Sequence, residues 1–216
     1  MTSLREPHKD TEFEVARHVA AHAIAHLHMG QSFRSVGAHA AGWWEVIEPI
    51  WGTDQGTNAR VALAGPCLDL AVALVEEDGD FALVGSWLET WRDDVASRPQ
   101  GYRHDMVDAA GSITDAVAWA LAFCRANLEL IDELAWALTK MHAPVDYALI
   151  SARFSGRSAD VDPATLNVAE RDLVGHGRAL ARIDEAVADY LDAERAETGL
   201  HESVRVPLAA GLLDPS

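Results

Sequence analysis

The chain has 216 residues, of which 49% are hydrophobic and 24% are charged, and its formal net charge is −17. These proportions are typical of a soluble globular protein with one sizeable core. The excess of acidic side chains argues against nucleic acid or an anionic membrane as a partner, because both attract basic patches. The expected partners are therefore a small molecule or a protein, including a second copy of this chain.

Neither a signal peptide nor a membrane span is expected from the sequence. The N-terminus, MTSLREPHKD, is charged and lacks the apolar core of a signal peptide. The longest nearly apolar run, Val61 to Val75, contains Asp69 and is too short to cross a bilayer. Cys67 and Cys124 fall inside helical patterns, which is typical of free buried thiols in a reducing compartment. We expect a cytoplasmic protein.

The first predicted element is a helix from Thr11 to Gly30, TEFEVARHVAAHAIAHLHMG. Thr11 and Glu14 have the spacing of a capping box, in which each side chain binds the other residue's free backbone amide. Gly30 is able to adopt the left-handed conformation that ends a helix. The sequence therefore defines both ends of this helix.

Three histidines recur at every fourth position of this helix. His18, His22 and His26 stack on one face, because these positions lie one turn apart, and apolar residues flank that face. Two histidines spaced by four offer two imidazoles to one zinc ion, as in the H-E-x-x-H motif. Val19 stands where that motif has its glutamate. The alternative is three core histidines, each hydrogen-bonded to a neighbour.

Short strands and a kinked helix are expected next. Pro49 excludes the second strand from a central place in a sheet, because proline has no backbone N–H to donate. Gly65-Pro66 should kink the helix that follows. The predicted elements are a strand from Ser32 to His39, a strand and turn from Gly42 to Trp51, a loop from Gly52 to Asn58, and a helix from Thr57 or Asn58 to about Glu77.

The rest of the chain is predicted to be mostly helical. The strongest pattern runs from Thr114 to Met141, where apolar residues recur in alternating steps of four and three. Ser86 opens a second capping box, and Pro144 is expected to start a helix that runs to about Phe154. Asp162-Pro163 has the pattern of another helix start. The predicted fold class is mainly α with a small β-sheet.

The last predicted helix carries a heptad pattern of apolar residues from Leu166 to Tyr190. So continuous an apolar seam must be buried on the same chain or on another one. Because symmetric pairing of two copies is the commonest arrangement, we expect a homodimer that uses this helix. The expected division is a domain over residues 1–157 and a C-terminal helical extension over residues 158–216.

Three segments carry a family resemblance. They read ARHVAAHAI from Ala16 to Ile24, RSV from Arg34 to Val36, and ALAGPCLD from Ala62 to Asp69. They are similar to A-x-H-E-A-G-H-A-V, R-S-V and A-L-A-G-(R/P)-A-A-E in the peptidase domain of FtsH-type, AAA-linked zinc metalloproteases. The first 155 residues resemble most closely the small stand-alone proteins with this domain. The resemblance implies a zincin-like helical domain, followed here by a long C-terminal helix.

The resemblance also implies a zinc site with a degenerate motif. In the family, two histidines and a later acidic residue bind zinc, and a glutamate activates water. By resemblance His18 and His22 are metal ligands and candidate catalytic residues, while Val19 replaces the glutamate. Loss of a general base costs typically about 10²–10⁴-fold in rate. The third ligand is expected within Ser86-Trp87-Leu88-Glu89, so that Trp87 replaces it. Ordinary peptidase activity, such as casein cleavage, is therefore not expected.

Strong zinc binding would then need replacement ligands, because catalytic zinc sites usually have three protein ligands. None of the available side chains has the family's spacing. The candidates are His26, His39, Asp69, Asp93, Asp94 and His104.

Aromatic side chains are expected to cover the histidine helix and to line a small-molecule pocket, which is typically apolar with a few converging polar groups. The alternative is that these aromatics refill the cleft as core. Glu45 could supply a catalytic carboxylate to a histidine, or it could face solvent. The expected pocket residues are His18, His22, His26, Trp43, Trp44 and Trp87.

Three functions are consistent with these patterns. The first is a non-proteolytic protein whose former active-site cleft binds a small molecule or performs non-hydrolytic chemistry. The second is a structural or interaction protein with a filled cleft. The third is a metal-dependent hydrolase with a rebuilt ligand set, for which zinc is the expected cofactor.

Overall fold

The computed structural model describes residues 12–39, 44–76, 105, 108–109, 111–141, 143–166, 171 and 177–198. Helices predominate in these residues, and three strands form one antiparallel sheet, so the fold is mainly α with a small β-sheet, as predicted. The elements are α1 (Glu12–His28), β1 (Ser32–His39), β2 (Trp44–Ile50), α2 (Gln55–Ala62), α3 (Ala64–Glu76), α6 (Ile113–Ala126), α7 (Leu128–Leu138), β3 (Val145–Asp146), α8 (Tyr147–Phe154), the 3₁₀ helix η1 (Pro163–Thr165) and α10 (Gly177–Thr198). No helix in these ranges is long and apolar enough to cross a membrane.

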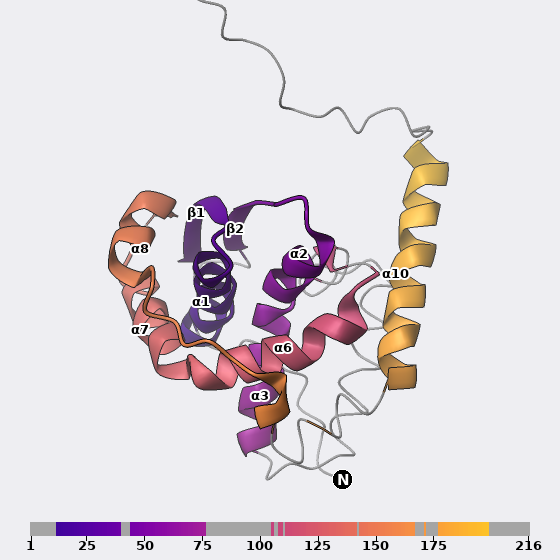
Figure 1. Cartoon of the computed structure of the whole chain (residues 1–216). Coiled ribbons are helices and arrows are strands. Elements are labelled where there is room, and N and C mark those ends of the chain that lie inside the picture. Colours follow the sequence, from indigo (N-terminus) through magenta and orange to yellow (C-terminus); the bar gives the residue numbers. More distant parts are fainter. Residues whose placement is uncertain are drawn as a thin grey trace, which may run out of the picture.

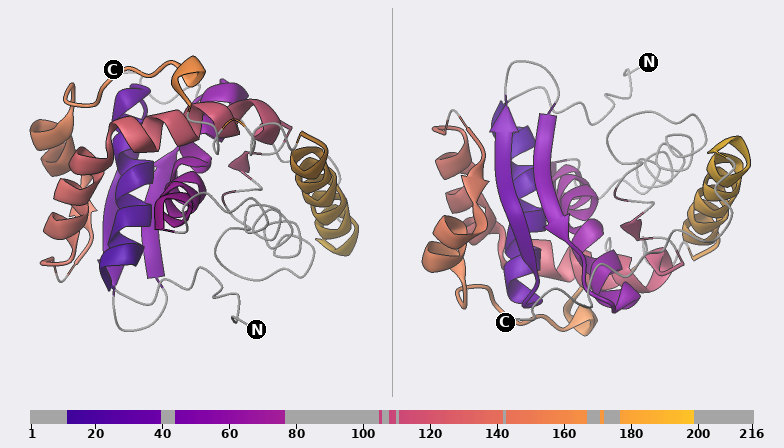
Figure 2. Two further views of the ribbon diagram at one scale, coloured as in Figure 1. Left: turned by 90° about the horizontal axis from the view of Figure 1, so that it is seen from below. Right: turned by 90° about the horizontal axis from the view of Figure 1, so that it is seen from above.

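Helix α1 lies between the strands β1 and β2 and the helices α3 and α7 (Figure 1). Strands β1 and β2 contact it on one side, and α3 and α7 contact it elsewhere. Figure 2 shows the two strands running alongside the helix. Every residue from Val19 to His26 is buried, which is the pattern of an enclosed helix rather than a surface helix with one apolar face.

The C-terminal end of α1 is fixed by a Schellman motif, as Gly30 predicts. Gly30 has a φ of 66°. The Gln31 N–H donates to the His26 carbonyl at 2.9 Å, and the Gly30 N–H donates to the Leu27 carbonyl at 3.2 Å. The predicted N-cap, Thr11, lies outside the described residues.

The sheet has the order β2-β1-β3. Strand β1 has the predicted bounds, and it pairs with β2 from Ser32 opposite Ile50 to His39 opposite Trp44. Pro49 therefore lies in a strand with one described neighbour, where its missing N–H costs least. Strand β3 was not predicted. It pairs Val145 with Val36, and two residues are too few to show a periodicity.

The kink predicted near Gly65-Pro66 appears as a one-residue interruption between α2 and α3. Leu63 separates the two helices, and Pro66 has no N–H to donate to the carbonyl one turn earlier. Helix α2 begins before Thr57, because Asp54 is the N-cap and its carboxylate accepts the Thr57 N–H at 3.0 Å. The break leaves Gly65 facing the histidines of α1.

The prediction of a single helix from Thr114 to Met141 is wrong, because Asn127 divides it into α6 and α7. The Asn127 side-chain amide donates to the Phe123 carbonyl at 2.9 Å, and its oxygen accepts the Ala159 N–H at 2.7 Å. Such side-chain bonds to the backbone compete with helical bonds. The apolar stripe continues through both helices, so its spacing did not reveal the break.

Two later helices also begin at other residues than predicted. Pro144 precedes β3, and α8 starts at Tyr147. Asp162 is an N-cap as expected, with its carboxylate accepting the Ala164 N–H at 2.9 Å, but it starts only the short η1. Leu166 is extended, with φ −55° and ψ 140°, so the long helix from Asp162 is wrong and α10 begins at Gly177.

Helix α10 buries its apolar seam on its own chain. Leu180, Ile183 and Val187 are fully buried, and Tyr190 is nearly so. The helix contacts α6 and lies on the opposite side of the molecule from α8 (Figure 1). The apolar seam is thus buried within one chain, which is one of the two alternatives that the sequence left open. The homodimer and the domain boundary after residue 157 stay predictions.

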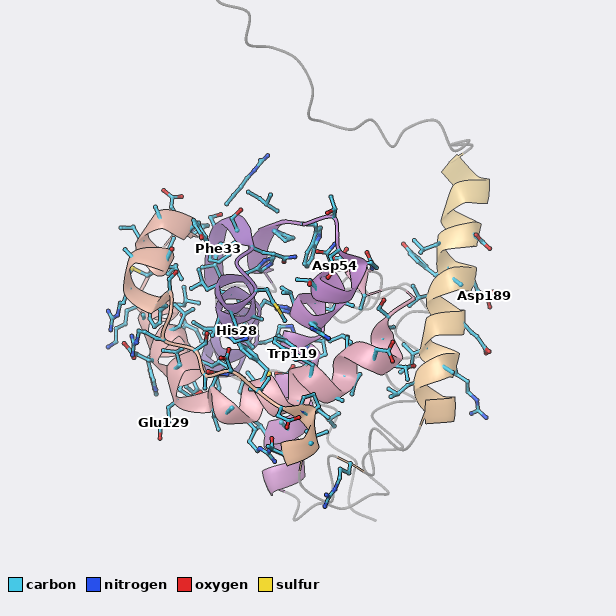
Figure 3. The ribbon with its side chains drawn as sticks, in the orientation of Figure 1. His28, Phe33, Asp54, Trp119, Glu129 and Asp189 are labelled. Atoms are coloured by element: carbon cyan, nitrogen blue, oxygen red, sulfur yellow. The ribbon has the colours of Figure 1, made fainter. Side chains whose placement is uncertain are left out.

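Replacing Phe123 by alanine is expected to lower the free energy of unfolding by about 3–5 kcal/mol, because the deletion leaves a cavity in a packed core. Phe123 is fully buried and stacks on Trp119, with ring centroids 4.6 Å apart. Figure 3 shows Trp119 beside His28 in the interior. Urea denaturation measures the change, and Leu149→Ala is the control, since Leu149 is 67% exposed and should cost less than about 0.5 kcal/mol. Equal losses in the two variants would contradict this core.

Candidate metal centre

The two predicted ligands lie together inside the protein. His18 and His22 occupy successive turns of α1, both are buried, and their Nε2 atoms are 3.1 Å apart. Their ring planes make an angle of 67°, so the rings meet edge to face. The α-helix itself therefore brings one nitrogen of each ring to the same point.

The structure adds an acidic residue that the sequence analysis missed. Asp105 places one carboxylate oxygen 3.4 Å from His18 Nε2 and the other 3.4 Å from His22 Nε2. Among the described residues, these three form the one group of side chains whose arrangement could hold a metal ion. Asp105 is 19% exposed, so it is the member of the group nearest to solvent.

The distances from each nitrogen to its neighbours are close to the ligand spacing of a tetrahedral zinc site. In such a site the metal–nitrogen and metal–oxygen distances are about 2.0–2.2 Å, which puts neighbouring ligand atoms about 3.4 Å apart. The two nitrogens are 3.1 Å apart, and each lies 3.4 Å from a different oxygen of the Asp105 carboxylate, so both oxygens face the pair of imidazoles. Two imidazoles and one carboxylate form a donor set that zinc accepts readily, and three protein ligands leave a fourth position for water or substrate.

The outer nitrogens of both rings have partners that fix which nitrogen faces the centre. His22 Nδ1 lies 2.9 Å from the Val61 carbonyl, which can only accept, so Nδ1 carries the hydrogen. His18 Nδ1 lies 2.8 Å from Asp69 Oδ2 and likewise donates to the carboxylate. When both rings are neutral, their Nε2 atoms present lone pairs to each other and to Asp105. Only a proton or a cation between them makes this arrangement favourable.

Gly65 leaves the space in which a cation would lie. A methyl group on this residue would be 2.4 Å from both His18 Nε2 and His22 Nε2. This distance exceeds the usual zinc–nitrogen distance of about 2.0–2.1 Å by only a few tenths of an ångström, so the methyl group and a bound metal ion would occupy nearly the same space. The absence of a side chain at residue 65 is therefore a requirement of the centre, and glycine is the residue that meets it.

The centre also changes the acidity of the carboxyl groups near it. Burial alone would raise the pKa of Asp105, but the charges of His22 and His18 and their hydrogen bonds lower it well below its usual range. Burial and the charge of Asp105 raise the pKa of Asp108 to about 6, with His22 opposing the shift. Asp108 is one helical turn after Asp105, and both residues precede α6.

His26, the third histidine of the ladder, is not part of this group. It is buried, and neither ring nitrogen has a hydrogen-bond partner in the described part of the chain. Its ring lies against Trp51 and Phe33, with centroid distances of 5.2 and 5.7 Å. Burial, and next the charge of His22, lower the pKa of His26 to about 3, so the ring is neutral at pH 7.

Of the remaining candidate ligands from the sequence, the structure describes the side chain of Asp69 alone. Asp69 binds the outer nitrogen of His18, so it supports a ligand rather than replacing one. Val19 is completely buried, and no carboxylate occupies the position of the H-E-x-x-H glutamate. The backbones of His39, Trp44 and Glu45 lie in β1 and β2, but their side chains are outside the described part of the structure, and so are Trp43, Trp87, Asp93, Asp94 and His104.

Asp105 was missed because the third ligand was expected near Trp87. One signal was available: an acidic residue placed shortly before the long helical pattern that begins near Thr114. Asp105 directly follows His104 in the sequence, and His104 was among the predicted replacement ligands. Its distance to the histidines depends on how α6 crosses the protein, and no local pattern encodes that distance.

Comparisons with known protein families, with curated proteins and with solved structures find no match to this chain. The resemblance to the FtsH-type peptidase domain therefore stays a prediction.

Proposed function

We propose that this protein is a zinc-dependent hydrolase with a rebuilt active site, in which His18, His22 and Asp105 hold the metal. The observation that carries the proposal is the convergence of two buried imidazole nitrogens, 3.1 Å apart, on one carboxylate whose two oxygens lie 3.4 Å from them. The fourth zinc position would bind water or a substrate oxygen, and the metal would lower the pKa of that water or polarise the substrate carbonyl. The residues of this chain position the ion and limit its exposure to solvent.

The proposed enzyme is not an ordinary H-E-x-x-H peptidase, because Val19 cannot accept a proton from water. A second candidate function follows from the same residue: a zinc protein that binds a ligand at the fourth position without hydrolysing it. The valine at position 19 supports this alternative, because no base occupies the place of the H-E-x-x-H glutamate. The substrate is proposed to be a small molecule.

The hydrogen bond between Asp69 and His18 allows the proposal to be tested with two substitutions of different expected strength. Asp69→Asn is expected to weaken zinc binding about 10–100-fold, because the carboxylate orients the ligating ring and raises its basicity. Asp105→Asn should weaken it more, since it removes a ligand. Zinc titration of chelator-treated protein measures both, and Asp189→Asn, on the exposed face of α10 (Figure 3), is the control.

The order of the zinc affinities of these four proteins tests the proposed ligand set. Wild type and Asp189→Asn should bind about one zinc ion per chain with equal affinity, Asp69→Asn more weakly, and Asp105→Asn most weakly. An Asp105→Asn protein that binds zinc as tightly as wild type would contradict the ligand set, and with it the proposed function.

A further inference from the structure

Asp105 and Asp108 lie on the same face of one helical turn. The Ala109 N–H donates to the Asp105 carbonyl at 3.0 Å, which closes the turn. Residues three apart in such a turn are neighbours on its surface. The Gln55 side chain donates to the Asp108 carbonyl at 3.0 Å, so α2 holds the turn in place. The turn that supplies the acidic ligand thus carries a second carboxylate beside it.

The Asp108 carboxyl group lies one helical turn from the ligand Asp105, within the electrostatic influence of the centre. It is partly buried, and the charges of both Asp105 and His22 act on it. No hydrogen bond within the described part of the chain occupies its oxygens; the bond from Gln55 goes to its backbone. A carboxylate one turn from a metal ligand, with no hydrogen bond to its oxygens from the described residues, is able to accept a hydrogen bond from a water molecule at the open position of the centre.

The other carboxylates of the centre are engaged. Asp105 contacts both Nε2 atoms, and Asp69 binds His18 on the side of the ring that points away from them. Val19 offers no acceptor. Among the described residues of the centre, Asp108 is therefore the acid that is left for proton transfer.

We propose that Asp108 is the general base of this centre and replaces the glutamate missing at Val19. This inference rests on the proposed function. With an ester substrate, Asp108 takes one proton from the attacking water molecule as the oxygen of that water bonds to the carbonyl carbon. The carbon–oxygen bond to the alcohol then breaks, the alcohol leaves with the electron pair of that bond, and Asp108 returns its proton to the leaving oxygen or to solvent. No oxidant or second substrate is needed.

The test uses the zinc-loaded full-length chain and 4-nitrophenyl acetate as the probe. Asp108→Asn is expected to lower kcat by about 10²-fold or more, with KM and zinc stoichiometry unchanged. Asp108→Glu should recover part of the loss, because it restores a carboxylate. The control Asp189→Asn should match wild type, and His22→Ala gives the rate without the centre. The visible absorption spectrum of the cobalt-substituted protein should be the same for wild type and Asp108→Asn, which shows that the ligands are undisturbed.

Each other outcome has a distinct meaning. Wild-type kcat in Asp108→Asn, with no activity in His22→Ala, overturns the role of Asp108 and leaves the zinc centre standing. Loss of zinc from Asp108→Asn overturns it too, because Asp108 would then hold the metal. Zinc-loaded wild type that is no faster than His22→Ala overturns the base assignment and the hydrolytic part of the proposed function. Failure of the wild type to bind zinc contradicts the proposed function as a whole.

Discussion

Replacing Gly65 by alanine is expected to abolish zinc binding even though His18, His22 and Asp105 all remain. The added methyl group would lie 2.4 Å from both Nε2 atoms, in the space that the metal needs. To relieve this contact the rings must turn away, which breaks their outer hydrogen bonds to Asp69 and Val61. The loss of affinity should exceed the roughly 10–100-fold that an outer-shell substitution costs. Zinc titration of the chelator-treated variant measures it.

The matched control is Gly56→Ala. Gly56 lies in α2, and the nearest atom to an added methyl group there is an oxygen of the flexible Asp54 side chain at 3.8 Å. This variant should bind zinc as wild type does. Far-ultraviolet circular dichroism shows whether each variant keeps its helices. A folded Gly65→Ala protein with wild-type zinc affinity would mean that the metal does not lie between the two imidazoles.

Removing zinc is expected to lower the melting temperature by about 5–10 °C. A ligand at 100 times its dissociation constant adds about 2.7 kcal/mol to the free energy of unfolding, and in a chain of this size 1 kcal/mol corresponds to about 2–4 °C. The physical reason is local: without a cation, two Nε2 lone pairs and a carboxylate face one another inside the protein. Thermal unfolding with zinc and with a chelator measures the shift.

His22→Ala provides the comparison for this second prediction. The variant lacks one ligand, so zinc should leave its melting temperature nearly unchanged, whereas wild type should respond. If both proteins respond equally, zinc acts at another place on this acidic chain. If neither responds, the centre does not bind zinc at the concentration used.

Local signals in the sequence predicted the parts of the fold that local physics determines. The spacing of His18 and His22 placed two imidazoles together because the helix repeat is fixed. Gly30 ended α1 because its left-handed conformation is available to glycine at little cost. Pro49 excluded β2 from the centre of the sheet. In each case the cause lies within a few residues of its effect.

Features that depend on distant contacts were not predicted. The break at Asn127 requires Ala159 as a partner, and β3 exists because β1 offers it an edge. Asp105 belongs to the centre because of how its helical turn is held against α2. Helical periodicity reports which face of a helix is apolar, and it does not report which side chains from separate helices meet.

The most direct test of the account is the metal content of protein purified without a histidine tag and without added metal. Elemental analysis should find about one zinc ion per folded wild-type chain, and almost none in His22→Ala purified in parallel. Folded wild-type protein that contains no zinc, and takes up none when zinc is supplied after chelator treatment, would contradict the central claim that His18, His22 and Asp105 form a zinc site.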